Sequence, residues 1–277
     1  MVLIYLTANV IIINLNREGM QSEKIINFIK NWLTDYVEKA HQKGFVVGIS
    51  GGIDSAVVST LCAITGKPTL CVEMPIHQDK NQVDRAQKHI DFLKNKYKNV
   101  SSVAVDLTST FETFKNETPP TDSPQLDLSL ANTRARLRMT CLYYFAGLGK
   151  QLVVGTGNKV EDFGVGFFTK YGDGGVDISP IADLMKSEVF ALAKKLEVID
   201  DIQKAQPTDG LFGDERSDED QLGATYDELE WAMTFKGDVT QLSKRQTEVL
   251  EIFQRLNKQN QHKVTPIPIC EIPENLK

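Results

Sequence analysis

The sequence predicts an α/β fold: a doubly wound, mainly parallel sheet flanked by helices in a single domain. Four apolar segments with strand character alternate with helix-compatible segments, and this alternation is typical of βαβ units. The strand-like segments are almost continuously apolar, which favours burial on both faces of a parallel sheet. The predicted strands are residues 45–49, 69–74, 100–107 and 152–155.

The helices are predicted from apolar residues at helical spacing. Ser22 is expected to be the N-cap of a first helix that ends near Ala40. Two long loops, 164–175 and 206–220, interrupt the later helices, and long loops in a compact domain often carry function. The tail 264–273 contains three prolines and is expected to lack regular structure. The other predicted helices are 54–64, 79–94, 127–148, 186–196, 226–235 and 240–260.

Composition limits the class of protein. With 41% hydrophobic and 25% charged residues, the 277-residue chain resembles ordinary soluble proteins. A net charge of −6 argues against a broad nucleic-acid-binding surface. The four cysteines form no Cys-x-x-Cys pair, which suits a reducing compartment, so a cytoplasmic location is expected.

Residues 1–19 are set apart as an N-terminal extension to a domain spanning 20–277. Their apolar stretches are interrupted by Thr7, Asn9 and Asn14, and no basic segment precedes them. This pattern matches neither a signal peptide nor a membrane span. Met20 stands just before the first helix signal, so an over-extended start site is the preferred explanation. An additional edge strand is the alternative.

The segment after the first predicted strand carries the strongest functional signal. An apolar strand leads into a Ser-Gly-Gly turn and then into a helix, a corner that presents backbone N–H groups to phosphate. Asp54 adds a hard carboxylate ligand for a phosphate-bound magnesium ion. Neither a Walker A spacing nor a Gly-x-Gly-x-x-Gly motif is present. The predicted phosphate-binding loop consists of Gly48, Ile49, Ser50, Gly51, Gly52, Ile53, Asp54 and Ser55.

Further distinctive motifs follow the fourth predicted strand, at 156–161, 166–175, 177–180, 184–186, 207–208 and 262–263. With the loop, they make the chain similar to the ammonia-dependent NAD synthetases of the N-type ATP pyrophosphatase superfamily, over residues 25–268. The Ser-Gly-Gly-x-Asp-Ser loop is shared across that superfamily. The sequence Phe-Phe-Thr-Lys-Tyr-Gly-Asp-Gly-Gly at 167–175 points to the NAD synthetases themselves. The implied fold is that of the adenine nucleotide α-hydrolases.

The resemblance implies a two-step ligase reaction, the last step of NAD biosynthesis. The nicotinate carboxylate of deamido-NAD attacks the α-phosphate of ATP, giving an acyl-adenylate and pyrophosphate. Ammonia then attacks the activated carbonyl, giving NAD and AMP. Because a carboxylate does not react with ammonia at neutral pH, adenylation supplies the leaving group. Charge develops on phosphate oxygens, so backbone N–H groups, magnesium and lysine are the expected stabilisers.

The resemblance also implies a role for individual residues. Asp54 and Glu161 would bind magnesium, and Asp173 is a candidate for handling the ammonium proton. Lys186 would act in catalysis, as a cation that adapts to moving phosphate oxygens. Besides the loop, the expected ATP contacts are Thr156, Lys186 and Thr208. The expected deamido-NAD contacts are Arg136, Lys170, Asp177, His262 and Lys263.

A homodimer with deamido-NAD at the subunit interface is also implied. The other expected partners are small molecules: ATP, deamido-NAD and ammonia. No glutaminase domain fits before Gly48 or after Lys263, so free ammonia is the expected nitrogen donor. A separate glutaminase chain stays open as an alternative, and neither nucleic acid nor membrane is expected as a partner.

Several residues have a simpler structural interpretation. Arg134, Arg136 and Arg138 alternate on a predicted helix and do not share one face, so only the motif selects Arg136. Glu161 and Asp162 could be acids at a helix start. The acidic segment 214–220 is interpreted as solvated, although in the family this region closes over the site. Packing or solvent exposure is expected for His41, His77, His89, Tyr226 and Trp231.

The stretch between Glu161 and Gly166 reads Asp-Phe-Gly-Val and is one residue longer than in the shorter variant of the family. A tRNA-modifying or purine-amidating enzyme of the same superfamily would favour cysteine pairs or basic appendages, and neither is found. A non-catalytic nucleotide sensor would be favoured by loss of Asp54, Glu161 or Lys186, and all three are present.

Overall fold

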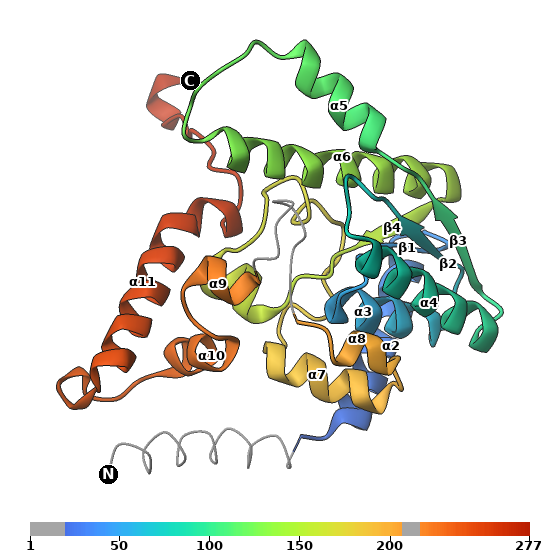
Figure 1. Ribbon diagram of the computed structural model, residues 1–277, viewed down its shortest axis with the longest axis horizontal. Helices are drawn as coiled ribbons and strands as arrows, with labels where there is room; N and C mark the ends of the chain where they lie inside the picture. The colour runs from blue at the N-terminus through green and yellow to red at the C-terminus, as the bar shows by residue number, and fades with distance from the viewer. Residues whose placement is uncertain (1–19, 207–216) are drawn as a thin grey trace.

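The computed structural model contains a four-stranded parallel sheet with strand order β3-β2-β1-β4, which lies between α6 and the helices α2, α3 and α4 (Figure 1). The structure describes residues 20–206 and 217–277, so the extension at 1–19 lies outside it. Each predicted strand is present and paired in parallel, which confirms the predicted fold class. The strands are β1 (Gly44–Gly48), β2 (Thr69–Glu73), β3 (Val100–Ala104) and β4 (Gln151–Val154).

Helices cover both faces of the sheet. Alternate residues of β1 belong to different apolar cores: Phe45 and Val47 pack with the helices of one face, whereas Val46 packs toward α6 on the other. The chain therefore changes faces between β3 and β4, which makes the sheet doubly wound and places a crevice beyond the carboxyl ends of β1 and β4. The helices are α2 (Ser22–Lys39), α3 (Ile53–Ala63), α4 (Lys80–Lys96), α7 (Lys186–Lys195) and α8 (Asp200–Gln203) on the first face, and α6 (Leu126–Gly149) on the second.

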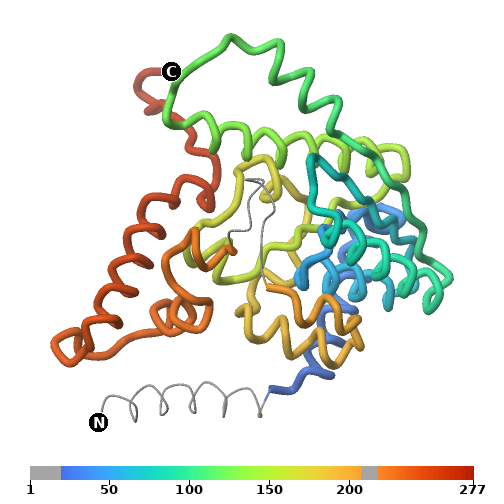
Figure 2. Tube along the Cα trace, in the orientation of Figure 1, coloured from blue at the N-terminus to red at the C-terminus, as the bar shows by residue number. Residues whose placement is uncertain are grey.

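A second apolar core lies away from the sheet. Figure 2 shows the chain after residue 217, orange to red, packing beside the yellow segment that follows β4. Val160, Leu229 and Val249 are buried together in this core. It joins helices α9 (Asp218–Leu222), α10 (Tyr226–Thr234) and α11 (Lys244–Val264) to η1 (Val160–Val165).

The segment η1 is a π-helix, where the sequence predicted the start of a loop at residue 164. A π-helical turn holds one residue more than an α-helical turn and is often found at functional sites. The residue expected to be additional between Glu161 and Gly166 falls within this turn. Gly166 then ends it in a left-handed conformation, with φ of +66°.

Several predicted boundaries were wrong for local reasons. The strand predicted to reach residue 107 ends at Ala104. Oδ1 of Asp106 accepts a hydrogen bond from the Thr108 backbone N–H in the turn that precedes a helix that was not predicted. The first helix has Gln21, not Ser22, at its N-cap. Ser243 caps α11, so this helix begins four residues later than predicted. The helices that sequence reasoning missed are α5 (Thr108–Glu117), α8 and α9.

The tail after Val264 has no regular structure until a short 3₁₀ turn, η3 (Glu274–Leu276), which confirms the proline-based prediction. Within the described ranges, none of the helices combines the length and apolar character that crossing a bilayer requires.

Candidate active site

The glycine-rich loop between β1 and α3 is packed tightly against α4. Gly51 has a φ of +81°, and a Cβ added there would lie 2.5 Å from the carbonyl oxygen of Gln82. Only glycine fits both the conformation and the space. Ser55 Oγ donates to the Gly52 carbonyl at 3.0 Å, which closes the turn. Because α3 begins at Ile53, its first N–H groups have no intrahelical partner and face the crevice as a site for an anion.

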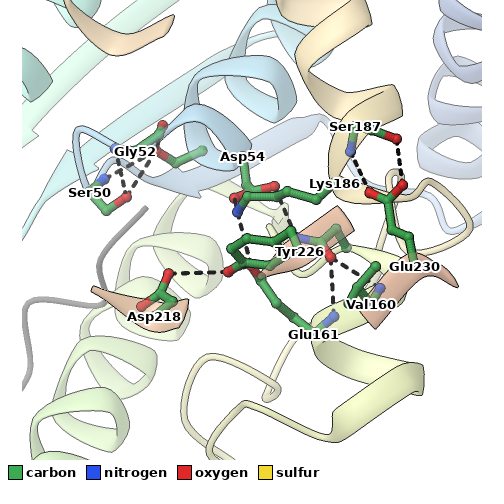
Figure 3. Close-up of polar contacts among 12 residues, drawn as sticks. Ser50, Gly52, Asp54, Val160, Glu161, Lys186, Ser187, Asp218, Tyr226 and Glu230 are labelled. Carbon is green, nitrogen blue, oxygen red and sulfur yellow. Dashed lines mark hydrogen bonds and ion pairs between the residues drawn. The ribbon is translucent and has the colours of Figure 1, made fainter. Parts of the chain in front are cut away.

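A buried lysine joins the loop to the segment after β4 (Figure 3). Nζ of Lys186 lies 2.6 Å from Oδ2 of Asp54 and 2.9 Å from Oε1 of Glu161. Lys186 is 3% exposed, so both carboxylates meet their cation with little water between them. The lysine comes from the first turn of α7, which Glu230 of α10 caps with bonds to the N–H and hydroxyl of Ser187, each 2.7 Å long.

Two further residues hold this cluster in position. The hydroxyl of Tyr226 donates to Oε1 of Glu161 at 2.6 Å, and its ring centroid lies 4.7 Å from Lys186 Nζ. Asn158 is fully buried; its amide donates to Oδ1 of Asp54 at 3.2 Å, and its oxygen accepts from the N–H of Glu161 at 3.1 Å. Asn158 therefore links the glycine-rich loop 48–55 to the π-helix, and Tyr226 links the π-helix to α10.

The charges of the cluster shift the pKa values of its members. Burial alone would lower the pKa of Lys186, but attraction by Asp54 and Glu161 outweighs it and raises the pKa, so the lysine stays charged. Among the described residues, no cation lowers the pKa of the neighbouring acid Asp162. Desolvation, reinforced by Glu161, Asp173 and Asp54, raises its pKa to about 8. The site therefore combines two carboxylates that share one ammonium group with an acid that favours its neutral form.

A pocket opens at the carboxyl ends of β1, β2 and β4. The loop 48–55 lines it, together with Thr156, Glu161, Asp173 and Lys186. The structure thus brings together predicted residues that are separated by more than a hundred positions in the sequence. Thr208, another expected ATP contact, lies outside the described residues.

Asp173, predicted to handle the ammonium proton, lies on the wall of this pocket. Its Oδ1 accepts a hydrogen bond from the Thr169 backbone N–H at 2.9 Å, which fixes the carboxylate within the loop. Desolvation raises the pKa of Asp173, and the bond from Thr169 opposes that rise.

The residues expected to contact deamido-NAD lie outside the wall of this pocket. Four of them come from α6, α11 and the loop between η1 and α7, and three form one chain of contacts: Arg136 Nη2 donates to the Lys170 carbonyl at 3.3 Å, and Lys170 Nζ donates to the His262 carbonyl at 2.6 Å. Lys263 Nζ donates to the carbonyls of residues 166 and 168. Asp177 lies apart from them, where it accepts from the hydroxyl of Tyr143 and the N–H of Val153.

The interpretation of 214–220 as a solvated segment was wrong for Asp218, and residues 214–216 lie outside the described chain. Asp218 opens α9, is 6% exposed, and has Oδ2 3.2 Å from the Tyr226 hydroxyl. The expectation for Tyr226 was incomplete, because the residue packs in the second core but also bonds to Glu161. His89 is fully buried, as expected for a structural residue.

The residues that line or support the pocket and that sequence reasoning missed include Glu73, Asn158, Asp162 and Tyr226. Only Asn158 had a usable signal, since it stands inside the motif 156–161 that was singled out. No group of three or more metal-binding side chains occurs within 20–206 and 217–277. A two-carboxylate site for magnesium remains compatible with this, because that ion keeps several waters and binds substrate phosphates.

A sequence model of the NAD synthase family matches residues 25–267, which is most of the chain. The chain belongs to the NAD synthase family. Its relatives in that family include an NH₃-dependent NAD⁺ synthetase of Mesoplasma florum, 38% identical over 76% of this chain and 84% of the relative. The corresponding enzyme of Carboxydothermus hydrogenoformans is 35% identical over 88% and 93%.

Solved structures of the family share the fold. An NMN synthetase from Francisella tularensis superposes with a TM-score of 0.81 and 32% identity, covering 92% of this chain and all of the other. An NH₃-dependent NAD synthetase from Campylobacter jejuni gives a TM-score of 0.74 and 27% identity, covering 91% of this chain and all of the other. The chain is thus similar to solved structures named for two different products.

Proposed function

We propose that this protein catalyses the ATP-dependent amidation of deamido-NAD by ammonia, giving NAD, AMP and pyrophosphate. The observation that carries the proposal is the convergence of Asp54, Glu161 and Lys186 beside an open helix N terminus at the crevice of a doubly wound sheet. Such a site offers N–H donors, a cation and carboxylates to a triphosphate. Membership of the NAD synthase family indicates deamido-NAD as the carboxylate that is adenylated and ammonia as the nitrogen donor.

In the adenylation step, the loop 48–55 would bind the ATP phosphates through backbone N–H groups. The nicotinate carboxylate would attack the α-phosphorus, the bond between the α- and β-phosphates would break, and pyrophosphate would leave. Lys186 would stabilise the charge that develops on the transferred phosphoryl group, because its ammonium is buried from water and stays charged beside the loop. Thr156 and Thr208 are proposed as further ATP contacts.

Asp54 and Glu161 are proposed to hold the magnesium ion of this reaction. Their fit to a cation rests on the arrangement itself, since the two carboxylates already converge on one ammonium group. When bound, magnesium would neutralise phosphate charge. Lys186 would then be free to follow the phosphates, and Asn158 and Tyr226 would keep the two carboxylates in place.

In the amidation step, ammonia would attack the acyl carbon and AMP would leave. Ammonia arrives mostly as ammonium near neutral pH, so an acceptor for its proton is required. Asp173 is proposed for this role because it lines the pocket and the pKa of its carboxyl is raised. Arg136, Lys170, Asp177, His262 and Lys263 are proposed to hold the rest of deamido-NAD, from a group of elements beside the pocket.

A second candidate substrate is nicotinate mononucleotide, whose amidation would give NMN. The similarity to the NMN synthetase of Francisella tularensis, with a TM-score of 0.81, favours it, whereas the relatives at 35–38% identity are named as NAD⁺ synthetases. Both reactions share adenylation of a nicotinate carboxylate. The two substrates differ in the AMP half, so the residues beside the pocket would decide between them.

A homodimer and a cytoplasmic location also belong to this proposal. Tyr144 and Leu148, one helical turn apart near the end of α6, are 63% and 69% exposed. They lie close in sequence to Tyr143, which holds Asp177, so a second subunit on α6 would lie near a proposed substrate contact. Sedimentation of a fully active monomer would contradict the dimer.

The decisive experiment combines purified protein, ATP, magnesium, an ammonium salt and either deamido-NAD or nicotinate mononucleotide. Formation of NAD and pyrophosphate is expected, with the higher kcat/KM for deamido-NAD. A higher kcat/KM for the mononucleotide would transfer the assignment to NMN synthesis. Absence of both products from folded protein would reject the proposal, and the same assay with glutamine would show whether a separate glutaminase is needed.

A further inference from the structure

Glu73 is a buried acid in the pocket that the reaction described above does not use. It is the last residue of β2, is 7% exposed and lines the pocket. Its Oε1 is buried and has no hydrogen-bond partner among the described residues. A buried carboxylate without a partner is costly to keep, so a bound molecule that donates to it would explain its presence.

The orientation of Glu73 follows from strand alternation. Cys71, two residues earlier, packs in the core beneath α3 and α4, whereas Val72 and Met74 pack toward α6. Glu73 therefore faces the α3–α4 side of the sheet, where the glycine-rich loop 48–55 begins. This side of the crevice lies next to β1, because β1 and β2 are neighbouring strands.

The donors around this part of the pocket are engaged elsewhere. Arg138 donates to the Met74 carbonyl at 3.0 Å and to Oε1 of Gln78 at 2.8 Å. Gln78 in turn donates to Oε1 of Gln82, and Arg85 donates to the carbonyl of Gly51 at 3.4 Å. These hydrogen bonds of Arg138, Gln78 and Arg85 all go to acceptors other than Glu73.

The chemistry of the site narrows the kind of donor. An ionised carboxylate only accepts hydrogen bonds, and its two oxygens suit the two adjacent hydroxyls of a ribose. In dinucleotide-binding sheets of this class, whose loop reads Gly-x-Gly-x-x-Gly, an acid about 20 residues after the loop accepts a hydrogen bond from the ribose 2′-hydroxyl. The loop 48–55 differs from that motif in sequence. Glu73 has this relation to Gly51 in sequence and in the order of the strands.

We propose that Glu73 accepts hydrogen bonds from the ribose hydroxyls of ATP and makes the site selective for ribonucleotides. The inference rests on the proposed function, since it takes ATP as the nucleotide held by the loop 48–55. Desolvation raises the pKa of Glu73 in the free protein, as expected for an acid awaiting donors. A hydrogen-bonded ribose would replace the water that the carboxylate has lost.

The test is a nucleotide-binding cycle with wild type and Glu73→Gln, measured by calorimetry with magnesium and without the second substrate. The probes are ATP, 2′-deoxy-ATP, 3′-deoxy-ATP and ITP, which lacks the exocyclic amine of adenine. Wild type is expected to bind at least one of the deoxynucleotides about 10- to 100-fold more weakly than ATP. In Glu73→Gln this difference should fall to about threefold or less, while discrimination against ITP stays unchanged.

Other outcomes overturn the inference. Equal deoxynucleotide discrimination in wild type and Glu73→Gln, or none in wild type, would remove the ribose contact. A change confined to ITP would place Glu73 at the base instead. If wild type neither binds ATP nor forms NAD, the proposed function fails as well, which the wild-type ATP arm shows before any variant is compared.

Melting temperatures distinguish a structural role of Glu73 from a role in binding ribose. Glu73→Gln and Glu73→Met should melt no lower than wild type without nucleotide, because the lost carboxylate has no partner at Oε1 to leave behind. Glu38→Gln is the matched control. Glu38 lies on α2 and its substitution removes an exposed ion pair with Lys67, so this variant should keep wild-type discrimination between ATP and the deoxynucleotides. A lower melting temperature of both Glu73 variants, with wild-type discrimination in the folded protein, would overturn the proposal.

Discussion

The hydroxyl of Tyr226 and the Nζ of Lys186 both donate to the same oxygen, Oε1 of Glu161, at 2.6 and 2.9 Å. The tyrosine ring also lies beneath the ammonium group, so one side chain from α10 orients both the acid and its cation. This relationship couples the second apolar core to the glycine-rich loop 48–55.

Replacing Tyr226 by Phe should weaken the function of Glu161 without removing the ring. Hydrogen bonds to charged groups contribute about 1.5–3 kcal/mol, so kcat/KM at limiting magnesium should fall about 10- to 100-fold. Rates measured across a magnesium titration should recover at high magnesium if the hydroxyl positions a metal ligand. Tyr97→Phe, at the end of α4 and away from the pocket, is the control. A loss of rate that is independent of magnesium would contradict this role.

Replacing Lys186 by Met should leave Asp54 and Glu161 facing each other without a cation. Removal of one partner from a buried pair costs about 3–5 kcal/mol, so the unfolding free energy in chelator should drop by about that amount. Magnesium should restore part of the stability, and no NAD should form. Lys195→Met breaks an exposed pair with Glu23 and should change stability by about 1 kcal/mol or less. Equal destabilisation with and without magnesium would show that the carboxylates do not bind the ion.

Gly51 and Gly66 have similar backbone angles, so alanine substitutions at the two positions distinguish backbone strain from steric crowding around the added Cβ. Gly66 has a φ of +77° and nothing within 4 Å of an added Cβ, whereas Gly51 has a φ of +81° and the Gln82 carbonyl at 2.5 Å. Gly66→Ala should therefore cost only the left-handed penalty of about 1–2 kcal/mol. Gly51→Ala should be less stable than Gly66→Ala and should lose ATP binding, as denaturant unfolding and calorimetry would measure. Equal stability of the two variants would mean that the loop moves freely away from α4.

The buried His89 predicts a pH dependence of stability. Desolvation lowers its pKa to about 4, below its ordinary value of 6.5, while Nε2 lies 2.9 Å from the Ser59 hydroxyl. With a lowered folded pKa, its stabilising contribution is present above pH 6.5 and is lost as the pH falls toward 4. At pH 5 the loss should be about 2 kcal/mol. His89→Gln should show that much less loss between pH 7.5 and 5 in denaturant unfolding, and the exposed His41→Gln should match wild type.

Much of the fold was predictable because its signals are local. Alternating strand and helix patterns identified all four strands, and the loop 48–55 was placed at the correct corner. Boundaries failed where a single side chain bonds to the backbone locally, as Asp106 does before α5 and Ser243 in capping α11. Such caps compete with the periodicity of neighbouring residues, so the pattern alone places an end only approximately.

The sequence by itself determined the doubly wound sheet, the glycine-rich loop 48–55 at its corner and the family, because each depends on residues that are adjacent or periodically spaced. Only the tertiary structure decided that Lys186 lies between Asp54 and Glu161, that Tyr226 holds them, and that Glu73 faces the pocket with a free acceptor. The Lys186–Asp54 pair spans 132 positions. Contacts of that separation depend on how helices pack on the sheet, and no local pattern encodes which buried polar atoms will meet.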